Sequence, residues 1–281
     1  MPTIALTGAA GNLGRLVAEH LLDRTEPADV ILITRRPEAV ADLADRGAQV
    51  RSADFTRPDT LVDAFAGVDR LLIISADDVG TRLAGQLAAV SAAQRAGVDH
   101  VFYTSVTKPV VDNPAGVGPD HRATEEALTA SGLRWTSLRN NLYAEFQVPT
   151  IQQAAASGQL VTNAGGGLAS YVTRSDCAAA AAAALLEPEP ARVYDISGPA
   201  GISTADLAAL AATLRGAPVE VVDLDDAAYV AGLVAAGLPE PVAELLASFG
   251  TAIREGYLDQ TSTAVRDLTG VEPTPLSALI A

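Results

Sequence analysis

The 281-residue sequence predicts an α/β protein in which a doubly wound parallel sheet precedes a smaller, mostly helical region. Three observations predict this class. Apolar runs of strand length alternate with helical periods through the first half of the chain. A glycine-rich turn joins the first predicted strand to the first predicted helix. After about residue 145 the regular alternation stops and short helices dominate.

The first half supplies the strands of the main sheet. We expect strands at 3–7, 30–34, 49–54, 70–76, 100–105 and 134–140, and helices at 12–24, 58–65, 81–96 and 120–131, with another opening at Pro37. Segment 12–24 has leucine and valine at helical spacing, whereas 30–34 is a continuous apolar run typical of a strand buried on both faces. Gly97 and Gly132 stand where helix C-caps belong.

The second half is less regular. We expect helices at 148–157, 176–186, 204–214, 227–236 and 241–255, and strands at 160–167, 193–197 and 219–224. The chain is therefore divided into residues 1–145 and a smaller region, residues 146–281, which covers the crevice of the sheet. The strand at 193–197 is a candidate to rejoin the first sheet.

Composition excludes several classes of function. Lys and Arg number 19 against 34 Asp and Glu, so the net charge of −15 repels phosphate backbones and argues against nucleic-acid binding. The most apolar run, 177–186, is far shorter than the ~20 residues that cross a membrane, and the first residues do not resemble a signal peptide. The only cysteine, Cys177, rules out an intrachain disulfide and fits a reducing cytoplasm.

The turn TGAAGNLG (7–14) indicates a nucleotide site. Gly8, Gly11 and Gly14 follow a strand and open an amphipathic helix, which is the setting of Rossmann-type dinucleotide binding. One glycine permits the tight turn, another lets the backbone approach a pyrophosphate, and the third packs helix against strand. Amide groups at the helix start then face the anion. The alternative is a glycine turn without a ligand.

The end of the second strand favours NADPH over NADH. An acidic residue there would accept the ribose 2′-hydroxyl, but this chain has Thr34, Arg35 and Arg36. Guanidinium groups suit a 2′-phosphate, and Arg35 is the expected closer contact, unless both arginines are solvated turn residues. Asp54 and Phe55 end the third strand and are expected to flank the adenine; alternatively, Asp54 only caps the next helix.

Dehydrogenases of this fold usually carry a tyrosine and a lysine four apart on one helix, and this pair is missing. Tyr103 and Lys108 are five apart, and Tyr103 lies in a predicted strand. The acceptor should therefore take hydride readily, as a quinone does, with the protein supplying orientation. No Cys/His cluster indicates a metal. His121 begins a helix at the carboxyl end of the sheet, where it either bonds the cofactor, donates a proton or has no chemical role.

The chain resembles the NmrA-like group of atypical short-chain dehydrogenases, and within it the bacterial NADPH:quinone oxidoreductase type. The shared motifs run nearly from end to end. They are TGAAGNLGRLV (7–17), RPDTLVDAFAGVDRLLIIS (57–75), HRATEEAL (121–128), LRNNLY (138–143), LVTNAGGG (160–167), YVTRSDCA (171–178) and AGLPEPVAE (236–244). The last four are the most specific, because other Rossmann chains lack them.

This resemblance implies an NADP-binding Rossmann domain followed by a substrate-binding region, with NADPH in the cleft between them. It assigns cofactor contacts to Gly8, Ala10, Gly11, Asn12, Leu13, Arg35, Ser75, Ala76, Asn140, Asn141, Leu142 and Tyr143. It assigns the quinone pocket to Thr162, Asn163 and Ala164. It makes His121 the first candidate for proton transfer, since related reductases of aromatic natural products have a lysine there, and Tyr143 the second.

The expected function is transfer of hydride from NADPH to a quinone or a similar flat conjugated acceptor, in a monomer or homodimer whose partner is a small molecule. Two alternatives stay open: a non-catalytic sensor of the NADP(H) state, and a reductase or isomerase for one natural product. Ser105, Ala76 and Asn141 depart from the residues expected in the quinone reductases. These three positions leave the acceptor open, since fold analogy does not establish a substrate.

Overall fold

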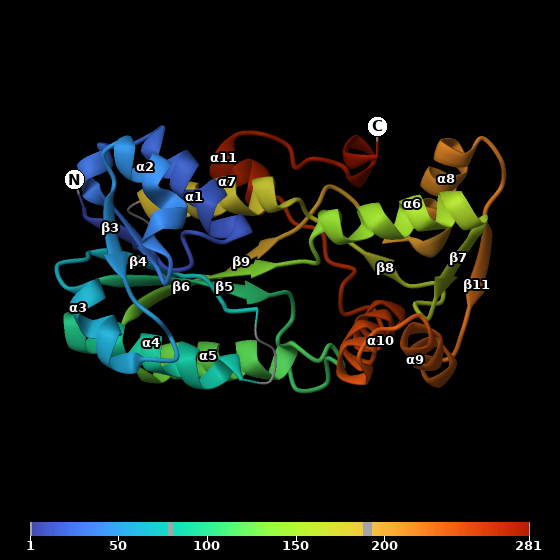
Figure 1. The fold of residues 1–281 in the computed structure, drawn as a ribbon, viewed down its shortest axis with the longest axis horizontal. Helices are drawn as coiled ribbons and strands as arrows, with labels where there is room; N and C mark the ends of the chain where they lie inside the picture. The colour runs from blue at the N-terminus through green and yellow to red at the C-terminus, as the bar shows by residue number, and fades with distance from the viewer. Residues whose placement is uncertain (1, 78–80, 188–192, 281) are drawn as a thin grey trace.

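A computed structural model describes residues 2–77, 81–187 and 193–280, and it confirms the predicted class. Seven parallel strands form one sheet in the order β3-β2-β1-β4-β5-β6-β9, with helices on both faces (Figure 1). The strand order reverses between β1 and β4, which is the switch point of a doubly wound sheet. No helix in the described part of the chain is long and apolar enough to cross a membrane.

The strands of the sheet are short, and those at its centre are buried on both faces. They are β1 (Ile4–Leu6), β2 (Val30–Thr34), β3 (Gln49–Ser52), β4 (Arg70–Ile73), β5 (His100–Val106), β6 (Arg134–Asn140) and β9 (Val193–Ile196). Every residue of β1 and β2 is buried, as the continuous apolar runs predict. The strand at 193–197 does rejoin the sheet, because β9 pairs with β6.

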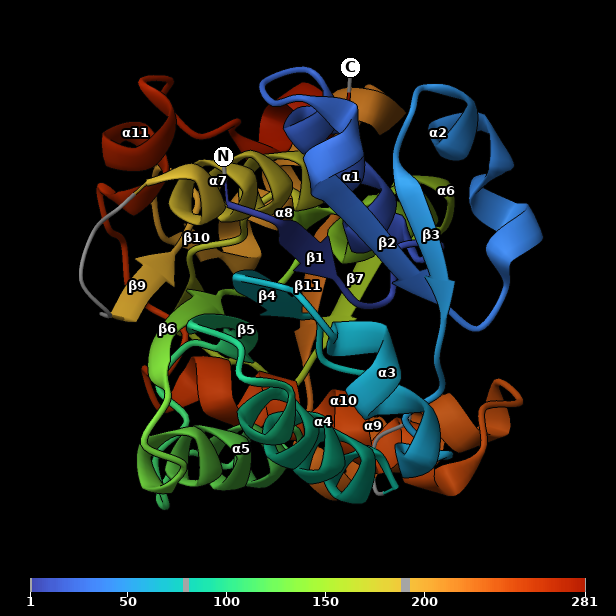
Figure 2. The same ribbon diagram turned by 90° about the vertical axis from the view of Figure 1, so that its left-hand side faces the viewer.

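Two helical layers enclose this sheet. One contains α1 (Asn12–Leu22), α2 (Ala41–Asp45), α7 (Arg174–Leu186) and α11 (Ala264–Thr269); the other contains α3 (Leu61–Phe65), α4 (Arg82–Ala96) and α5 (Gly118–Ala130). Figure 2 shows α1 and α7 on one side of the twisted strands and α4 and α5 on the other. The alanine side chains of α7 let it pack closely on α1 within one apolar core.

Most local sequence predictions are confirmed, with small shifts at element ends. Gly97 is the C-cap of α4 with a φ of 73°, and Gly132, with a φ of 75°, follows Ser131, the C-cap of α5. The helix expected to open at Pro37 begins as a 3₁₀ helix, η2 (Pro37–Val40), and the α-helix α2 starts directly after it. The strand expected at 160–167 is shorter than predicted: β7 covers Gln159–Thr162 and the glycines form a turn.

The smaller region has its own apolar core. Its elements are α6 (Gln147–Ser157), β7, β8 (Leu168–Ala169), β10 (Ile202–Ser203), α8 (Thr204–Arg215), β11 (Glu220–Asp223), α9 (Asp226–Ala235) and α10 (Glu240–Arg254). β7 pairs with β11 in parallel, and β8 pairs with β10 antiparallel. The chain passes repeatedly between the two regions, since α7, β9 and α11 all return to the main sheet. The domain boundary after residue 145 stays a prediction.

Candidate functional site

A cavity of about 880 Å³ lies along the carboxyl ends of β1, β2, β4, β5 and β6. Phe249 of α10 and Leu258 add a wall from the smaller region. Ligands of doubly wound sheets bind at this edge, where the strand order reverses. The volume lies within the roughly 300–1,000 Å³ typical of organic-ligand sites. The cavity also gathers all the residues predicted to bind the cofactor, as well as His121.

The glycine turn forms one end of the cavity. Gly8 has a φ of 64°, which other residues rarely adopt, and a Cβ atom on Gly14 would lie 2.2 Å from the Gly8 carbonyl oxygen. The first and third glycines are therefore required by the turn and by close packing, as predicted. Gly11 is the N-cap of α1 and provides no side-chain cap, so the first amide groups of this helix suit an anion such as a pyrophosphate.

Two arginine side chains after the end of β2 line the same cavity. Arg35 and Arg36 are exposed and line the cavity, while the Thr34 hydroxyl accepts a hydrogen bond of 3.1 Å from the Arg36 amide. The next acidic residue, Glu38, lies inside the following 3₁₀ helix. The site residues at this strand end therefore fit a phosphate better than a ribose hydroxyl.

Asp54 and Phe55 line the cavity, but Asp54 is also engaged in a turn. Its Oδ1 atom accepts a hydrogen bond of 2.9 Å from the Thr56 amide, and this bond is the main cause that lowers the pKa of Asp54. The carboxylate does not cap the next helix, η3 (Pro58–Thr60), whose N-cap is Arg57 and which has no side-chain cap. Contact of Asp54 with the adenine stays a prediction. Phe55 packs against Gly85 of α4, where a Cβ atom would lie 2.8 Å from Phe55 Cβ.

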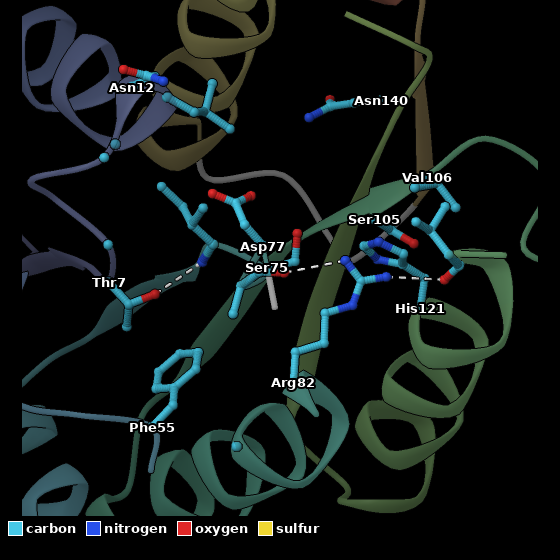
Figure 3. A pocket seen from close by; sticks show the side chains of 18 of the residues that line it. Thr7, Asn12, Phe55, Ser75, Asp77, Arg82, Ser105, Val106, His121 and Asn140 are labelled. Carbon is cyan, nitrogen blue, oxygen red and sulfur yellow. Dashed lines mark hydrogen bonds between the residues drawn. The ribbon is translucent and has the colours of Figure 1, made fainter. Parts of the chain in front are cut away.

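The segment after β4 is held by side chains from three other elements. The Thr7 hydroxyl accepts from the Ile74 amide at 3.0 Å, and the Thr104 hydroxyl accepts from the Ser75 amide at 2.9 Å. Arg82 donates to the Ala76 carbonyl at 3.1 Å (Figure 3). Ser75 and Ala76 therefore line the cavity in a fixed conformation at the end of β4, and their contact with the cofactor stays a prediction.

Arg82 is a component of the site that no sequence motif marked. It is buried, and besides Ala76 it donates to the Asp120 carboxylate at 3.0 Å and to the Val117 carbonyl at 3.1 Å. These bonds join the start of α4 to the start of α5. They also place a positive charge next to His121 (Figure 3).

His121 faces the cavity and contacts Tyr103 on its other side. The Tyr103 hydroxyl lies 2.8 Å from His121 Nδ1. Burial, followed by the charge of Arg82, lowers the pKa of His121 to about 3, and burial raises the pKa of Tyr103. His121 is therefore a neutral imidazole at neutral pH, which makes it a hydrogen-bond donor or acceptor rather than a source of protons.

The segment after β6 carries the residues expected at the nicotinamide end. Asn140, Asn141, Leu142 and Tyr143 all line the cavity. Asn141 is committed to the fold, because its amide donates to the Leu258 carbonyl at 3.0 Å. By contrast, the buried Asn140 Oδ1 and Thr107 Oγ1 atoms have no partner within the described residues. Buried polar atoms without partners are costly, so these two fit the polar edge of a ligand such as a carboxamide.

An aromatic platform lies at the mouth of the cavity. We define it as Tyr143, Phe146 and Arg174, because the Arg174 guanidinium carbon lies 4.7 Å from the centre of each ring. Phe146 is 58% exposed, whereas burial raises the pKa of Tyr143 and keeps its phenol neutral. Glu145 is 3.6 Å from Arg174 and holds its charge in place. Sequence reasoning gave Phe146 and Arg174 no role, since only folding brings them together.

The predicted quinone-pocket residues lie elsewhere. Thr162, Asn163 and Ala164 are not part of the cavity lining. The Asn163 amide instead donates to the Asp226 carboxylate at 2.7 Å and to the Ala247 carbonyl at 2.8 Å, which joins the loop after β7 to α9 and α10. Contact of these three residues with a quinone stays a prediction. In the described ranges, no group of three His, Cys, Asp or Glu residues is arranged to hold a metal.

Comparisons with known proteins agree with this geometry. A family model described as NAD(P)H-binding matches residues 8–188. Quinone oxidoreductase 2 of Escherichia coli is 34% identical over 275 residues, which covers 98% of this chain and 96% of that protein. The crystal structure of the E. coli enzyme with NADPH superposes with a TM-score of 0.94, at 33% identity and with 99% and 98% of the two chains covered. Citrobacter sp. triphenylmethane reductase with NADP(H) gives a TM-score of 0.92 at 36% identity, with the same coverage.

Proposed function

This chain belongs to the NAD(P)H-binding family of NmrA-like atypical short-chain dehydrogenases, and from that premise we propose that it reduces a quinone or another flat conjugated acceptor with NADPH. Family membership makes the chain an NAD(P)H-dependent oxidoreductase. The proposal adds the choice of dinucleotide, the class of acceptor and the residues that contact each. The single observation that carries it is the continuity of one cavity from the glycine turn to the aromatic platform.

The arginines after β2 support NADPH as the dinucleotide. Arg35 and Arg36 are exposed at the point where a 2′-phosphate lies in proteins of this fold, and no acidic residue takes their place. A guanidinium forms paired, charge-assisted bonds with a phosphate. The amide groups at the start of α1 would hold the pyrophosphate, and Asn140 with Thr107 would hold the carboxamide.

The opposite end of the cavity supports a planar acceptor. The ring of Phe146 is 58% exposed at the cavity mouth and lies against Arg174, so it offers a flat apolar surface for stacking. NADPH, when bound, supplies the hydride. The residues of this chain orient the acceptor, exclude water and offer hydrogen bonds from His121 and Tyr143. A quinone suits these neutral groups, because its reduced oxygen is a weak base that takes its proton without a strong acid.

Spectroscopic assay of the purified protein tests this function. NADPH or NADH is mixed with a panel of benzoquinones, naphthoquinones and a cationic triphenylmethane dye, and loss of the reduced cofactor is followed by absorbance. We expect faster oxidation of NADPH than of NADH, and turnover with quinones. Tight binding of NADP⁺ without turnover of any acceptor would contradict the proposal and favour a sensor of the NADP(H) state.

A further inference from the structure

In the described part of the chain, only one of the two ring nitrogens of His121 forms a hydrogen bond with the protein. Nδ1 lies 2.8 Å from the Tyr103 hydroxyl, and no hydrogen bond joins Nε2 to a described residue. His121 lines the cavity and Tyr103 does not, so the phenol lies behind the imidazole as seen from the ligand space. The question is which nitrogen carries the proton, since this decides what Nε2 offers to a ligand.

The surroundings of Tyr103 make its hydroxyl the donor. Burial raises the pKa of Tyr103, so the phenol keeps its proton and needs an acceptor. The neighbouring Thr124 hydroxyl donates to the Asp120 carbonyl at 2.8 Å and accepts from the Gln86 amide at 2.9 Å. Thr124 thus serves Asp120 and Gln86, and among the described residues the Tyr103 hydroxyl forms its hydrogen bond with His121 Nδ1. A phenol that keeps its proton donates it to this nitrogen, so the ring proton belongs on Nε2.

Burial is the main reason that the imidazole stays neutral, and the charged groups around it do not oppose this effect. Arg82, from α4, lies on one side of it and opposes a second positive charge. Asp120, on the same helix as His121, is neutralised by its 3.0 Å bond to Arg82. Glu125, one turn further along α5, forms a 3.0 Å bond with Arg139 of β6. The two carboxylates of α5 nearest to His121 are therefore both paired with arginines, and Asp77, which also lines the cavity, is not among the groups that shift the pKa of His121.

We propose that Tyr103 is a positioning residue, whose hydroxyl fixes His121 as the neutral Nε2–H tautomer so that the imidazole donates a hydrogen bond into the cavity. In combination with the proposed function, the group that receives this bond is the carbonyl oxygen of the acceptor. A neutral imidazole polarises a carbonyl as a donor and does not have to release its proton. The proposed roles of Tyr103 and His121 thus differ from those of the missing Tyr–Lys pair, in which the tyrosine itself contacts the substrate.

Nuclear magnetic resonance of the protein with ¹⁵N-labelled histidine tests the tautomer without any acceptor. The His121 signals, assigned by their loss in His121→Asn, are expected to show a protonated Nε2 and a bare Nδ1 from about pH 8 to about pH 5.5. A proton on Nδ1 alone, or an imidazolium near neutral pH, would overturn the proposal. In Tyr103→Phe the preference for Nε2–H is expected to weaken.

Kinetics then test the consequence for turnover. Tyr103→Phe is expected to lower kcat about tenfold with the KM for NADPH unchanged, which is the scale of one neutral hydrogen bond. The double variant Tyr103→Phe/His121→Asn should be no slower than His121→Asn, because Tyr103 acts on turnover only through His121. Tyr171→Phe, which changes another buried tyrosine outside the cavity, is the control and should leave kcat unchanged. Equal effects of Tyr171→Phe and Tyr103→Phe would reject a specific role.

The proposed function and this inference can fail separately. If the wild-type protein reduces no quinone, the proposed function is wrong, and the resonance experiment still decides the tautomer. If quinones are reduced while His121 carries its proton on Nδ1, the inference is wrong and the proposed function stands. Thermal unfolding of each variant shows whether a loss of turnover comes from a loss of fold.

Discussion

The two ends of the cavity are built by different means. At the glycine end, the shape comes from the backbone of one short stretch, in which Gly8 has a positive φ angle and Gly14 leaves no room for a Cβ atom. At the acceptor end, side chains from β5, α5, α7 and α10 meet across large separations in the sequence. The difference teaches that the dinucleotide end is specified by local sequence and the acceptor end by tertiary packing.

The largest effect should follow from a substitution that breaks the glycine end. In Gly14→Ala the new Cβ atom would lie 2.2 Å from the Gly8 carbonyl oxygen, so the turn must move away from α1. We expect loss of NADPH binding by more than about a hundredfold, measured by calorimetric titration. Gly232→Ala is the matched control, because a Cβ atom there contacts nothing within 4 Å. If Gly14→Ala binds normally, backbone shape does not govern this end.

The choice between dinucleotides depends on a side chain at the same end. Arg35→Ala is expected to weaken NADPH about tenfold to a hundredfold, the range of one or two charge-assisted hydrogen bonds, and to leave NADH nearly unchanged. Parallel titrations of wild type and variant with both dinucleotides check this. Arg36→Ala provides the comparison at the adjacent position. Equal weakening of NADPH and NADH would show that Arg35 does not bind the 2′-phosphate.

Stability should depend on pH through two buried histidines. Burial lowers the pKa of His100 to about 4 and of His121 to about 3, below the ordinary 6.5. The unfolded chain therefore binds more protons than the folded one below about pH 6.5, so stability is full above this value and falls as the pH drops toward about 4. The expected loss is at most about 1.4 kcal/mol per pH unit for each histidine.

Urea unfolding from about pH 7.5 to about pH 5 measures this loss. In His121→Asn, the free energy of unfolding should depend on pH with a slope smaller by one proton. The remaining dependence comes from His100, the first residue of β5. A stability that stays constant over this range would contradict the neutral state of both side chains. Cofactor binding at neutral pH serves as the check that the glycine end of the His121→Asn variant is intact.

The smallest effect is expected at the cavity mouth. Phe146→Ala removes the exposed ring of the aromatic platform and should raise the KM for a quinone about threefold to tenfold, the contribution typical of one aromatic contact. NADPH affinity should not change. Steady-state kinetics with each substrate varied in turn separate the two. If only the affinity for NADPH changes, the aromatic platform binds the cofactor and not the acceptor.

The sequence was informative where local rules govern the chain. Apolar runs and glycine C-caps predicted the strands and helices of the main sheet, and the motif at residues 7–14 predicted the cofactor end, because these features depend on neighbours in sequence. The segment 193–197 was predicted as a strand and as a candidate to rejoin the sheet, and β9 does pair with β6. All the predicted cofactor residues, from Gly8 to Tyr143, line one cavity, although contact with NADPH stays a prediction.

The acceptor end was harder to predict for a physical reason. Arg82 and Tyr103 act through hydrogen bonds to residues 38 and 18 positions away, and neither has a spacing that signals such a bond. Thr162, Asn163 and Ala164 were expected at a quinone pocket, but the amide nitrogen of Asn163 donates to Asp226 and to Ala247 and so joins this loop to α9 and α10. Side-chain partners chosen by tertiary packing leave no period or motif in the sequence.

The repeated passage of the chain between the main sheet and the smaller region restricts how the cleft can open. A swing of one half against the other would have to bend every connection that leads to α6, α7, β10 and α11 at the same time. A single-hinge opening is therefore unfavourable. Exchange of small molecules should proceed instead by local displacement of surface side chains such as Phe146, with the scaffold remaining still.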